Sequence, residues 1–144
     1  MRILVDADAC PVKQIIVRLA KLRGIPVTMF IDTAHELDDG YSTIITVACQ
    51  VDSVDYALVN YLAGGDIVVT QDFGLAAMAL AKGASVVNQN GFVYTNENID
   101  QLLFERSLGQ KLRRAGGRTK GPAKRSKEDD ERFTASLSRL AGIV

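Results

Sequence analysis

The sequence predicts an α/β fold, a three-layer α/β/α sandwich around a mostly parallel central sheet. Short apolar runs of strand length alternate along the chain with longer segments whose apolar residues recur at helical spacing. Such alternation is typical of parallel strands joined by helical crossovers, which cover both faces of the sheet. The length of 144 residues and the apolar content of 47% suit one domain with a hydrophobic core. We therefore expect a single domain over residues 1–144.

The residues at the ends of the expected elements mark their limits. Pro11 fits the first position of a helix, because the N–H that proline lacks has no partner there, and Gly24 fits its end. Val, Ile and Thr are concentrated in the expected strands. Asn90-Gly91 predicts a small hairpin within residues 88–95. In chain order we expect strand 3–5, helix 11–23, strand 25–31, strand 43–49, helix 52–65, strand 66–70, helix 73–83, strand 85–87 and helix 98–116.

The C-terminal part is expected to hold a loop and one more helix. The segment near 113–126 is rich in Gly and basic residues, which predicts a flexible basic loop. Ser126 opens the stretch "SKED", the signature of a capping box at a helix start. The apolar residues Phe133, Leu137 and Leu140 are spaced to dock this last helix on the body.

Charge is distributed unevenly although the formal net charge is zero. Residues 1–105 hold thirteen acids and six Lys or Arg, a net charge of −7. Residues 106–127, which we call the basic stretch, hold nine Lys or Arg and no acid. An acidic body favours a cation site, and a basic stretch favours contact with a polyanion. A solvated basic loop is the plainer alternative, since the stretch has no aromatic residue for base stacking.

Several classes of protein are disfavoured by composition. We expect no membrane span and no signal peptide, because acids interrupt the apolar runs, and hence a cytoplasmic location. Cys10 and Cys49 are expected to be reduced, buried thiols. With His35 as the one histidine, a structural zinc site and a histidine-based triad are improbable. A Walker-type phosphate loop and a dinucleotide-binding glycine motif are both missing from the sequence.

Acidic residues follow three of the expected strands. In open parallel sheets, sites lie beyond the carboxyl ends of the strands. We therefore expect these acids to gather at one edge, whereas Asp66 precedes its strand and should lie at the opposite edge. The acids expected at the shared edge are Asp6, Asp8, Asp52, Asp55 and Asp72.

A divalent cation would offset the repulsion between these carboxylates. Their hard oxygen ligands suit Mg²⁺ or Mn²⁺, and we expect Asp6, Asp8 and Asp72 to hold the ion. Each acid also has a local alternative. Asp52 and Asp72 would cap helices. Asp55 would be an exposed acid in the first turn of a helix, favoured there by the helix dipole. Asp6 and Asp8 would be turn residues.

Carboxylate-bound divalent ions favour phosphoryl transfer and phosphodiester hydrolysis, so we expect chemistry of this kind at the shared edge. Lys13, Arg118 and Lys120 are the candidate substrate-binding residues, and for Lys13 a pairing with Asp8 or simple exposure is the alternative. Two other functions are considered: a non-catalytic RNA-binding module, and a metal-dependent phosphohydrolase in which the first Asp of D-x-D, Asp6, is the nucleophile. No membrane partner is expected.

Five parts of the chain resemble the YaiI/YqxD family of bacterial proteins. They read "DADACPVK", "VDSVD", "GGDIVVTQDFGLAA", "NGFVYTNENI" and "GGRTKGP" with "SKEDDERF", and together they span nearly the whole chain. That family resembles PIN-like domains, many of which are metal-dependent ribonucleases. The resemblance implies a PIN-like sandwich with a nuclease site. It also implies a metal-dependent nuclease acting on nucleic acid, with RNA as the expected substrate. The acids it implies are Asp6 or Asp8, Asp52 or Asp55, and Asp72.

Three features depart from the patterns that these resemblances carry. Val51 stands where the family usually has Gly, and Gly74 stands where it often has Pro. The Glu that many PIN nucleases carry on their second helix has no clear counterpart. The departures bear on catalysis more than on the fold.

Overall fold

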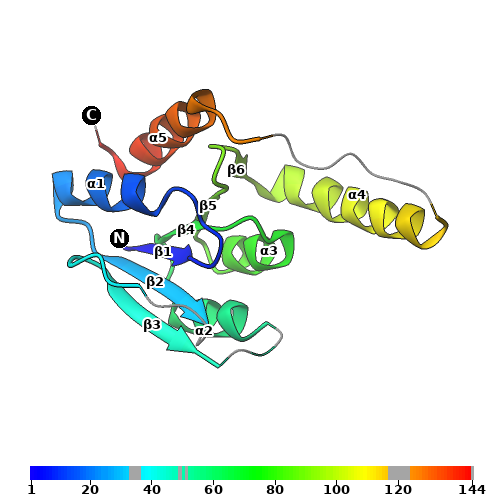
Figure 1. The fold of residues 1–144 in the computed structure, drawn as a ribbon, viewed down its shortest axis with the longest axis horizontal. Coiled ribbons are helices and arrows are strands. Elements are labelled where there is room, and N and C mark those ends of the chain that lie inside the picture. Colours follow the sequence, from blue (N-terminus) through cyan, green and yellow to red (C-terminus); the bar gives the residue numbers. More distant parts are fainter. Residues whose placement is uncertain (33–36, 49, 51, 117–123, 144) are drawn as a thin grey trace.

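The computed structural model describes residues 1–32, 37–48, 50, 52–116 and 124–143. Six strands and five helices lie within these ranges (Figure 1). In chain order they are β1 (Ile3–Asp6), α1 (Lys13–Arg23), β2 (Val27–Asp32), β3 (Thr43–Val47), α2 (Ser53–Tyr61), β4 (Ile67–Val69), α3 (Phe73–Ala81), β5 (Ser85–Val87), β6 (Val93–Tyr94), α4 (Asn96–Arg114) and α5 (Lys127–Ala141).

The strands form one sheet in the order β3-β2-β1-β4-β5-β6. All neighbouring pairs are parallel except β5 and β6, which are antiparallel. Val5 in β1 pairs with Met29 of β2 on one side and with Val69 of β4 on the other. The chain builds outward from β1 in both directions, so the strand order reverses between β1 and β4. In such sheets the crevice at the reversal is where ligands bind.

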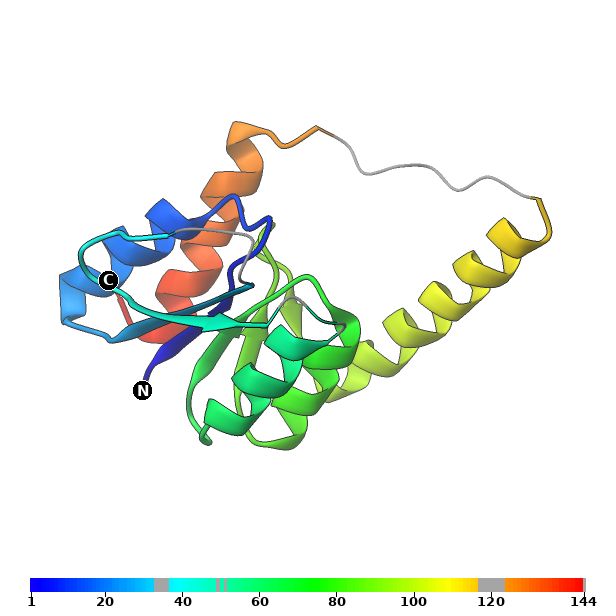
Figure 2. The ribbon, with the colours of Figure 1, turned by 60° about the horizontal axis from the view of Figure 1, so that its bottom comes forward.

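Helices cover both faces of the sheet, as the three-layer prediction requires (Figures 1 and 2). Ile3 and Val5 of β1 point into a core shared with α1 and α5. Leu4 points into the opposite core, shared with α2, α3 and the start of α4. All three side chains are fully buried, which explains why β1 reads as a continuous apolar run instead of an alternating one.

Several limits of the expected elements are corrected by the structure; helix α2, for example, ends at Tyr61 and not at residue 65. Helix α1 begins at Lys13, because Pro11 and Val12 form a turn that follows the left-handed backbone of Ala9 (φ 55°). Helix α4 continues through Arg113 and Arg114, so the first residues of the expected basic loop are helical. The helix is favoured there because Lys and Arg are good helix formers and stabilise a helix C-terminus. Residues 117–123 of that expected loop lie outside the described residues.

The hairpin and the last helix are confirmed. The turn between β5 and β6 closes with a hydrogen bond from Asn88 N to Phe92 O of 2.9 Å, and Gly91 has a φ of +85°. Ser126 forms the predicted capping box with Asp129. Phe133 and Leu137 of α5 are fully buried. Leu140 packs against the same core.

Helix α4 leaves the body of the protein and carries much of the basic stretch outward. Figures 1 and 2 both show its C-terminal end far from the sheet. Its apolar residues Phe104, Leu108 and Leu112 are exposed. None of the helices in the described ranges is long and apolar enough to span a membrane. Cys10 is a buried free thiol, as predicted, whereas Cys49 and His35 lie outside the described residues.

Candidate active site

Three carboxylates from separate segments meet at the strand reversal. Asp6 is the last residue of β1, Asp72 lies between β4 and α3, and Asp55 lies in the first turn of α2. Each of these segments ends at or begins from the carboxyl edge of the sheet, which brings the three side chains within electrostatic reach of one another. The carboxyl-edge rule therefore places these three acids together.

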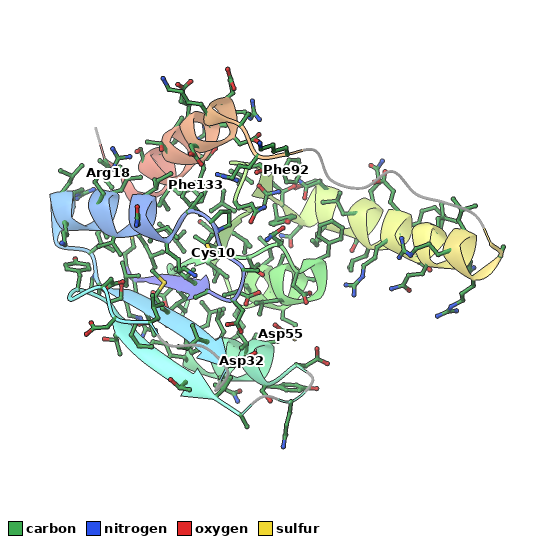
Figure 3. All side chains as sticks on the ribbon, in the orientation of Figure 1. Cys10, Arg18, Asp32, Asp55, Phe92 and Phe133 are labelled. Carbon is green, nitrogen blue, oxygen red and sulfur yellow. The ribbon has the colours of Figure 1, made fainter. Side chains whose placement is uncertain are left out.

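Asp55 carries the strongest electrostatic perturbation of the group. Partial burial raises its pKa to about 6, and the charges of Asp72, Asp6 and Asp52 act in the same direction. The Asp55 carboxyl also shares a hydrogen bond with Asp72. Two carboxyl groups in contact favour the retention of one proton between them, because two negative charges at that separation repel strongly. In Figure 3, Asp55 is labelled on α2, in the lower part of the view.

Thr70 joins the two strands that carry the other acids. Its Oγ1 donates a hydrogen bond of 2.9 Å to Asp6 Oδ2 and accepts one of 3.0 Å from the backbone N–H of Asp72. Burial raises the pKa of Asp6, and the bond from Thr70 opposes that rise. Sequence reasoning missed Thr70, although its place between β4 and Asp72 was the available signal.

The two predicted caps have different outcomes. Asp72 does cap α3, since its Oδ1 accepts a hydrogen bond of 3.1 Å from Leu75 N. That role is compatible with the site, because the capping bond leaves the second carboxylate oxygen, Oδ2, outside it. Asp52 stands at the N-cap of α2 with a left-handed φ of +61°, and its side chain makes no capping bond within the described residues. The exposed Asp52 contributes to the site through its charge on Asp55.

Asp8 and Lys13 lie beside this group and are held by backbone atoms. Asp8 Oδ2 accepts a hydrogen bond of 3.2 Å from Asp32 N, which directs that oxygen toward β2. Lys13 Nζ donates a hydrogen bond of 3.0 Å to Ala7 O, so its ammonium group contacts the backbone between Asp6 and Asp8. The other two candidate substrate-binding residues, Arg118 and Lys120, lie outside the described residues.

A small cavity of about 30 Å³ opens at this edge, close to the volume of one water molecule. Oxygen-bearing side chains dominate its wall, and Gln89 Oε1 is buried there without a hydrogen-bond partner in the described part of the chain. Gln89 follows β5, a position that sequence reasoning did not single out. The lining residues are Asp6, Asp8, Cys10, Val69, Thr70, Gln71 and Gln89.

The donor set fits a hard divalent cation. Carboxylate and amide oxygens are the ligands that Mg²⁺ and Mn²⁺ prefer, and Mg²⁺ needs only one or two carboxylates because it keeps several waters. Over residues 1–32, 37–48, 50, 52–116 and 124–143, no group of three or more His, Cys, Asp or Glu side chains is arranged to hold one ion. The shared ligation by Asp6, Asp8 and Asp72 thus stays a prediction.

Asp66 lies at the other edge of the sheet, as its position before β4 predicts. It is almost fully buried and forms an ion pair of 2.8 Å with Arg2. Hydrogen bonds from Arg2 and from the backbone N–H of Ala63 outweigh burial and lower the pKa of Asp66. Asp66 is therefore a structural acid, separate from the acids at the carboxyl edge.

Comparison with known proteins gives a consistent result over the whole chain. A family model described as "Uncharacterized BCR, YaiI/YqxD family" matches residues 4–142. A "UPF0178 protein" of Ruminiclostridium cellulolyticum is 66% identical over 137 residues, covering 95% of this chain and 90% of the relative. Relatives of the same description from Exiguobacterium sibiricum and Clostridium acetobutylicum are 54% and 52% identical, each covering 97% of this chain and 96% of its own length. No solved structure matches the chain. The chain belongs to the YaiI/YqxD family.

Proposed function

We propose that this protein hydrolyses phosphodiester bonds of nucleic acid, with RNA as the expected substrate and Mg²⁺ or Mn²⁺ as the cofactor. The observation that carries the proposal is the meeting of Asp6, Asp55 and Asp72 at the strand reversal, with Asp55 hydrogen-bonded to Asp72. A group of carboxylates that repel one another has a physical reason to bind a cation. The PIN-like resemblance of the sequence favours the same chemistry.

Asp6, Asp8 and Asp72 are the residues proposed to hold the ion. Gln89 lines the small cavity together with Asp6 and Asp8. A bound divalent ion would supply an activated water and stabilise charge on the phosphoryl oxygens. Thr70 fixes the orientation of Asp6 through its hydrogen bond of 2.9 Å. Since the Thr70 hydroxyl also accepts from Asp72 N, it holds the carboxylates of two strands in one arrangement.

Asp55 is proposed as the general base. A catalytic base works best when its pKa lies near the working pH, and the pKa of Asp55 is raised to about 6. Near pH 7 most molecules therefore carry Asp55 as a carboxylate that accepts a proton from water more readily than an ordinary Asp. Asp52 supports this role from the preceding turn, because its charge contributes to the raised pKa.

Basic groups beside the carboxylates would reduce the repulsion between site and substrate. Lys13 is the first residue of α1, and its ammonium group donates a hydrogen bond to Ala7 O. Arg125 belongs to the basic stretch and donates a hydrogen bond of 2.8 Å to Gln89 O, next to the small cavity. Arg118 and Lys120 are proposed to add phosphate contacts. Contacts of this kind position a strand without reading its sequence.

Hydrolysis of an end-labelled single-stranded RNA in Mg²⁺ or Mn²⁺ tests the proposal. Asp6→Asn and Asp72→Asn should each lower the rate at least about 100-fold, since the isosteric amides remove ligand charge and keep the shape. Asp100→Asn is the matched control, because it removes one exposed acid on α4 and should leave the rate unchanged. Equal activity in all four proteins would refute the assignment of the site.

Two alternative functions give different results in the same assay. A non-catalytic RNA-binding module would bind the RNA with no turnover in the parent protein. A metal-dependent phosphohydrolase would prefer phosphomonoesters and use Asp6 as the nucleophile. The phosphohydrolase alternative requires a second pair of acids later in the chain. Asp66 cannot form such a pair with Asp72, because Asp66 pairs with Arg2 at the opposite edge of the sheet.

A further inference from the structure

A larger cavity of about 540 Å³ is lined by residues of the turn between β5 and β6, of β6, and of helices α3, α4 and α5. Its volume is in the range of small-molecule sites. Three aromatic rings dominate the lining, and we call this space the aromatic cavity. Its lining residues are Phe73, Asn88, Asn90, Gly91, Phe92, Tyr94, Leu102 and Arg132.

The aromatic rings are arranged around Tyr94. The ring centroid of Tyr94 lies 5.9 Å from that of Phe73 and 5.4 Å from that of Phe92, with interplanar angles of 68° and 75°. Tyr94 is only 2% exposed, whereas Phe92 is 44% exposed. Tyr94 thus forms the buried base of the cavity, and Phe92 presents an aromatic surface to solvent beside it. Figure 3 shows Phe92 between α5 and the start of α4.

The turn that carries Phe92 is fixed before any ligand binds. Asn88 Oδ1 accepts hydrogen bonds of 2.9 Å from both Asn90 N and Phe92 N. Ser136 Oγ in α5 donates a hydrogen bond of 2.6 Å to Gly91 O. A Cβ at Gly91 would come within 2.5 Å of Arg132 O, so the turn lies directly on α5. Because the backbone of the turn is already fixed, the segment that carries the Phe92 ring loses little conformational entropy on binding.

The rim of the aromatic cavity is polar and carries two guanidinium groups. Arg132 lines it, and its side chain is 60% exposed although it pairs with Asp129. The Asn90 amide accepts a hydrogen bond of 2.8 Å from Arg125, which also forms an ion pair of 2.6 Å with Asp130. Aromatic surface combined with basic groups is the combination that binds single-stranded nucleic acid, because bases stack on rings and phosphates pair with cations.

The aromatic cavity adjoins the carboxylates. Phe73 is the next residue after Asp72, and Tyr94 lies near enough to feel the charge of Asp72. A strand with one phosphate at the carboxylates would thus bring a neighbouring base to Phe92. The basic stretch, residues 106–127, contains no aromatic residue, so base stacking has to come from elsewhere in the chain.

We propose that the aromatic cavity binds an unpaired nucleobase of a single-stranded nucleic acid, stacked against Phe92, while the backbone of that strand passes the carboxylates. The inference rests on the proposed function and adds to it the class of substrate: a single strand whose base is accessible. A paired base is excluded from the stack, so duplexes are poor ligands for this cavity.

The absence of tryptophan from the chain allows a direct test. Phe92→Trp introduces one indole at the cavity and keeps an aromatic face. Titration with a 12-nucleotide oligouridylate in chelator should quench its fluorescence, because a stacked base deactivates the indole. A 12-nucleotide abasic strand and a double-stranded RNA should leave it unquenched. Oligothymidylate is the DNA counterpart of oligouridylate. Quenching by both strands would mean that the cavity contacts the base and does not distinguish ribose from deoxyribose.

Affinity measurements on alanine variants complete the test. Phe92→Ala should weaken oligouridylate binding about 5- to 150-fold, the range that corresponds to 1–3 kcal/mol for one stacked base. It should leave binding of the abasic strand unchanged. Phe92→Leu keeps apolar bulk without an aromatic face and should be similarly weak, and circular dichroism checks that both variants fold. Phe104→Ala removes a phenyl from α4 that is even more exposed than Phe92, and this variant should bind like the parent.

The outcomes separate this inference from the proposed function. An unquenched Phe92→Trp protein, or an equal loss of affinity for the oligouridylate and the abasic strand, overturns the base-binding cavity. Because all binding is measured without metal, these results do not depend on hydrolysis. Base stacking in a protein that never cleaves RNA would refute the nuclease and support the cavity, and cleavage without stacking would do the reverse.

Discussion

Replacement of Asp55 by Asn should stabilise the folded protein at neutral pH. The pKa of Asp55 is raised from 3.8 to about 6 by burial and by neighbouring carboxylates. Between these values the folded state binds more protons than the unfolded state, so stability falls as pH rises through this window. Above about pH 6 the parent carries the whole electrostatic penalty of an ionised Asp55. An Asn at this position carries none of it.

The size of the effect follows from the shift in pKa. Each unit corresponds to 1.36 kcal/mol, which sets an upper limit of about 3 kcal/mol. Since Asp55 is only partly buried, solvent screening reduces the expected gain to about 1–2 kcal/mol at pH 7.5. At pH 4 parent and variant should have nearly equal stability, because the parent is then mostly protonated at Asp55.

Urea unfolding of both proteins in chelator, at half-unit steps from pH 4 to pH 8, measures the difference directly. Shifts at other groups cancel, because the lowered pKa values of Asp39 and Asp66 are common to both proteins. Asp100→Asn is the control for loss of one negative charge on the surface and should show no such pH dependence. A difference between Asp55→Asn and the parent that is constant over this range would refute the carboxylate pair.

Three further predictions address the metal, the basic stretch and the turn. Mg²⁺ at a hundred times its dissociation constant should raise the free energy of unfolding by about 2.7 kcal/mol, measured by thermal melts. Asp72→Asn should abolish that gain, while its amide oxygen keeps the cap on α3. Combined Arg118→Ala and Lys120→Ala should flatten the slope of log affinity against log salt by about 1.4 for single-stranded RNA, and an unchanged slope would mean that neither residue contacts phosphate. Gly91→Ala should cost roughly 3 kcal/mol or more, since it adds a clash with α5 to a left-handed φ of +85°. Gly65→Ala, with a φ of +87° and nothing within 4 Å, should cost only about 1–2 kcal/mol in the same urea titration.

The fold was predictable where the signal is local. Apolar runs gave the strands, and Ser126 with Asp129 gave the start of α5 through a capping box that depends on four residues alone. The limits of helices were less predictable. Pro11 is acceptable at a helix start, but Ala9 before it has a left-handed backbone conformation, and a turn follows in place of the helix. Alanine rarely adopts this conformation, so its presence in the sequence does not predict the turn. Arg113 and Arg114 stand beside a Gly-rich basic segment, which suggests a loop, but the helix propensity of Arg favours the end of a helix, and the structure has them in α4.

The site was predictable in position and less so in detail. A rule about parallel sheets suffices to bring Asp6, Asp55 and Asp72 to one edge. The pairing of Asp55 with Asp72 depends on how α2 and α3 pack, which spacing along the chain does not determine. Thr70 has a hydroxyl that many strand ends share. Gln89 enters the site only because the hairpin after β5 folds back onto α5, a contact between residues far apart in sequence.

The carboxylates and the aromatic cavity are joined through two adjacent residues of the chain, Asp72 and Phe73. Asp72 caps α3 and faces the carboxylates, and Phe73 opens the helix and faces Tyr94. A rigid helix start therefore fixes the distance between the place of hydrolysis and the place of base binding. If both proposals hold, a variant that disturbs the cap without changing charge, such as Asp72→Glu, should disturb cleavage and base stacking together. Phe92→Ala should by contrast raise the RNA concentration needed for half-maximal cleavage and leave the saturated rate nearly unchanged, because Phe92 touches the strand away from the reacting phosphate.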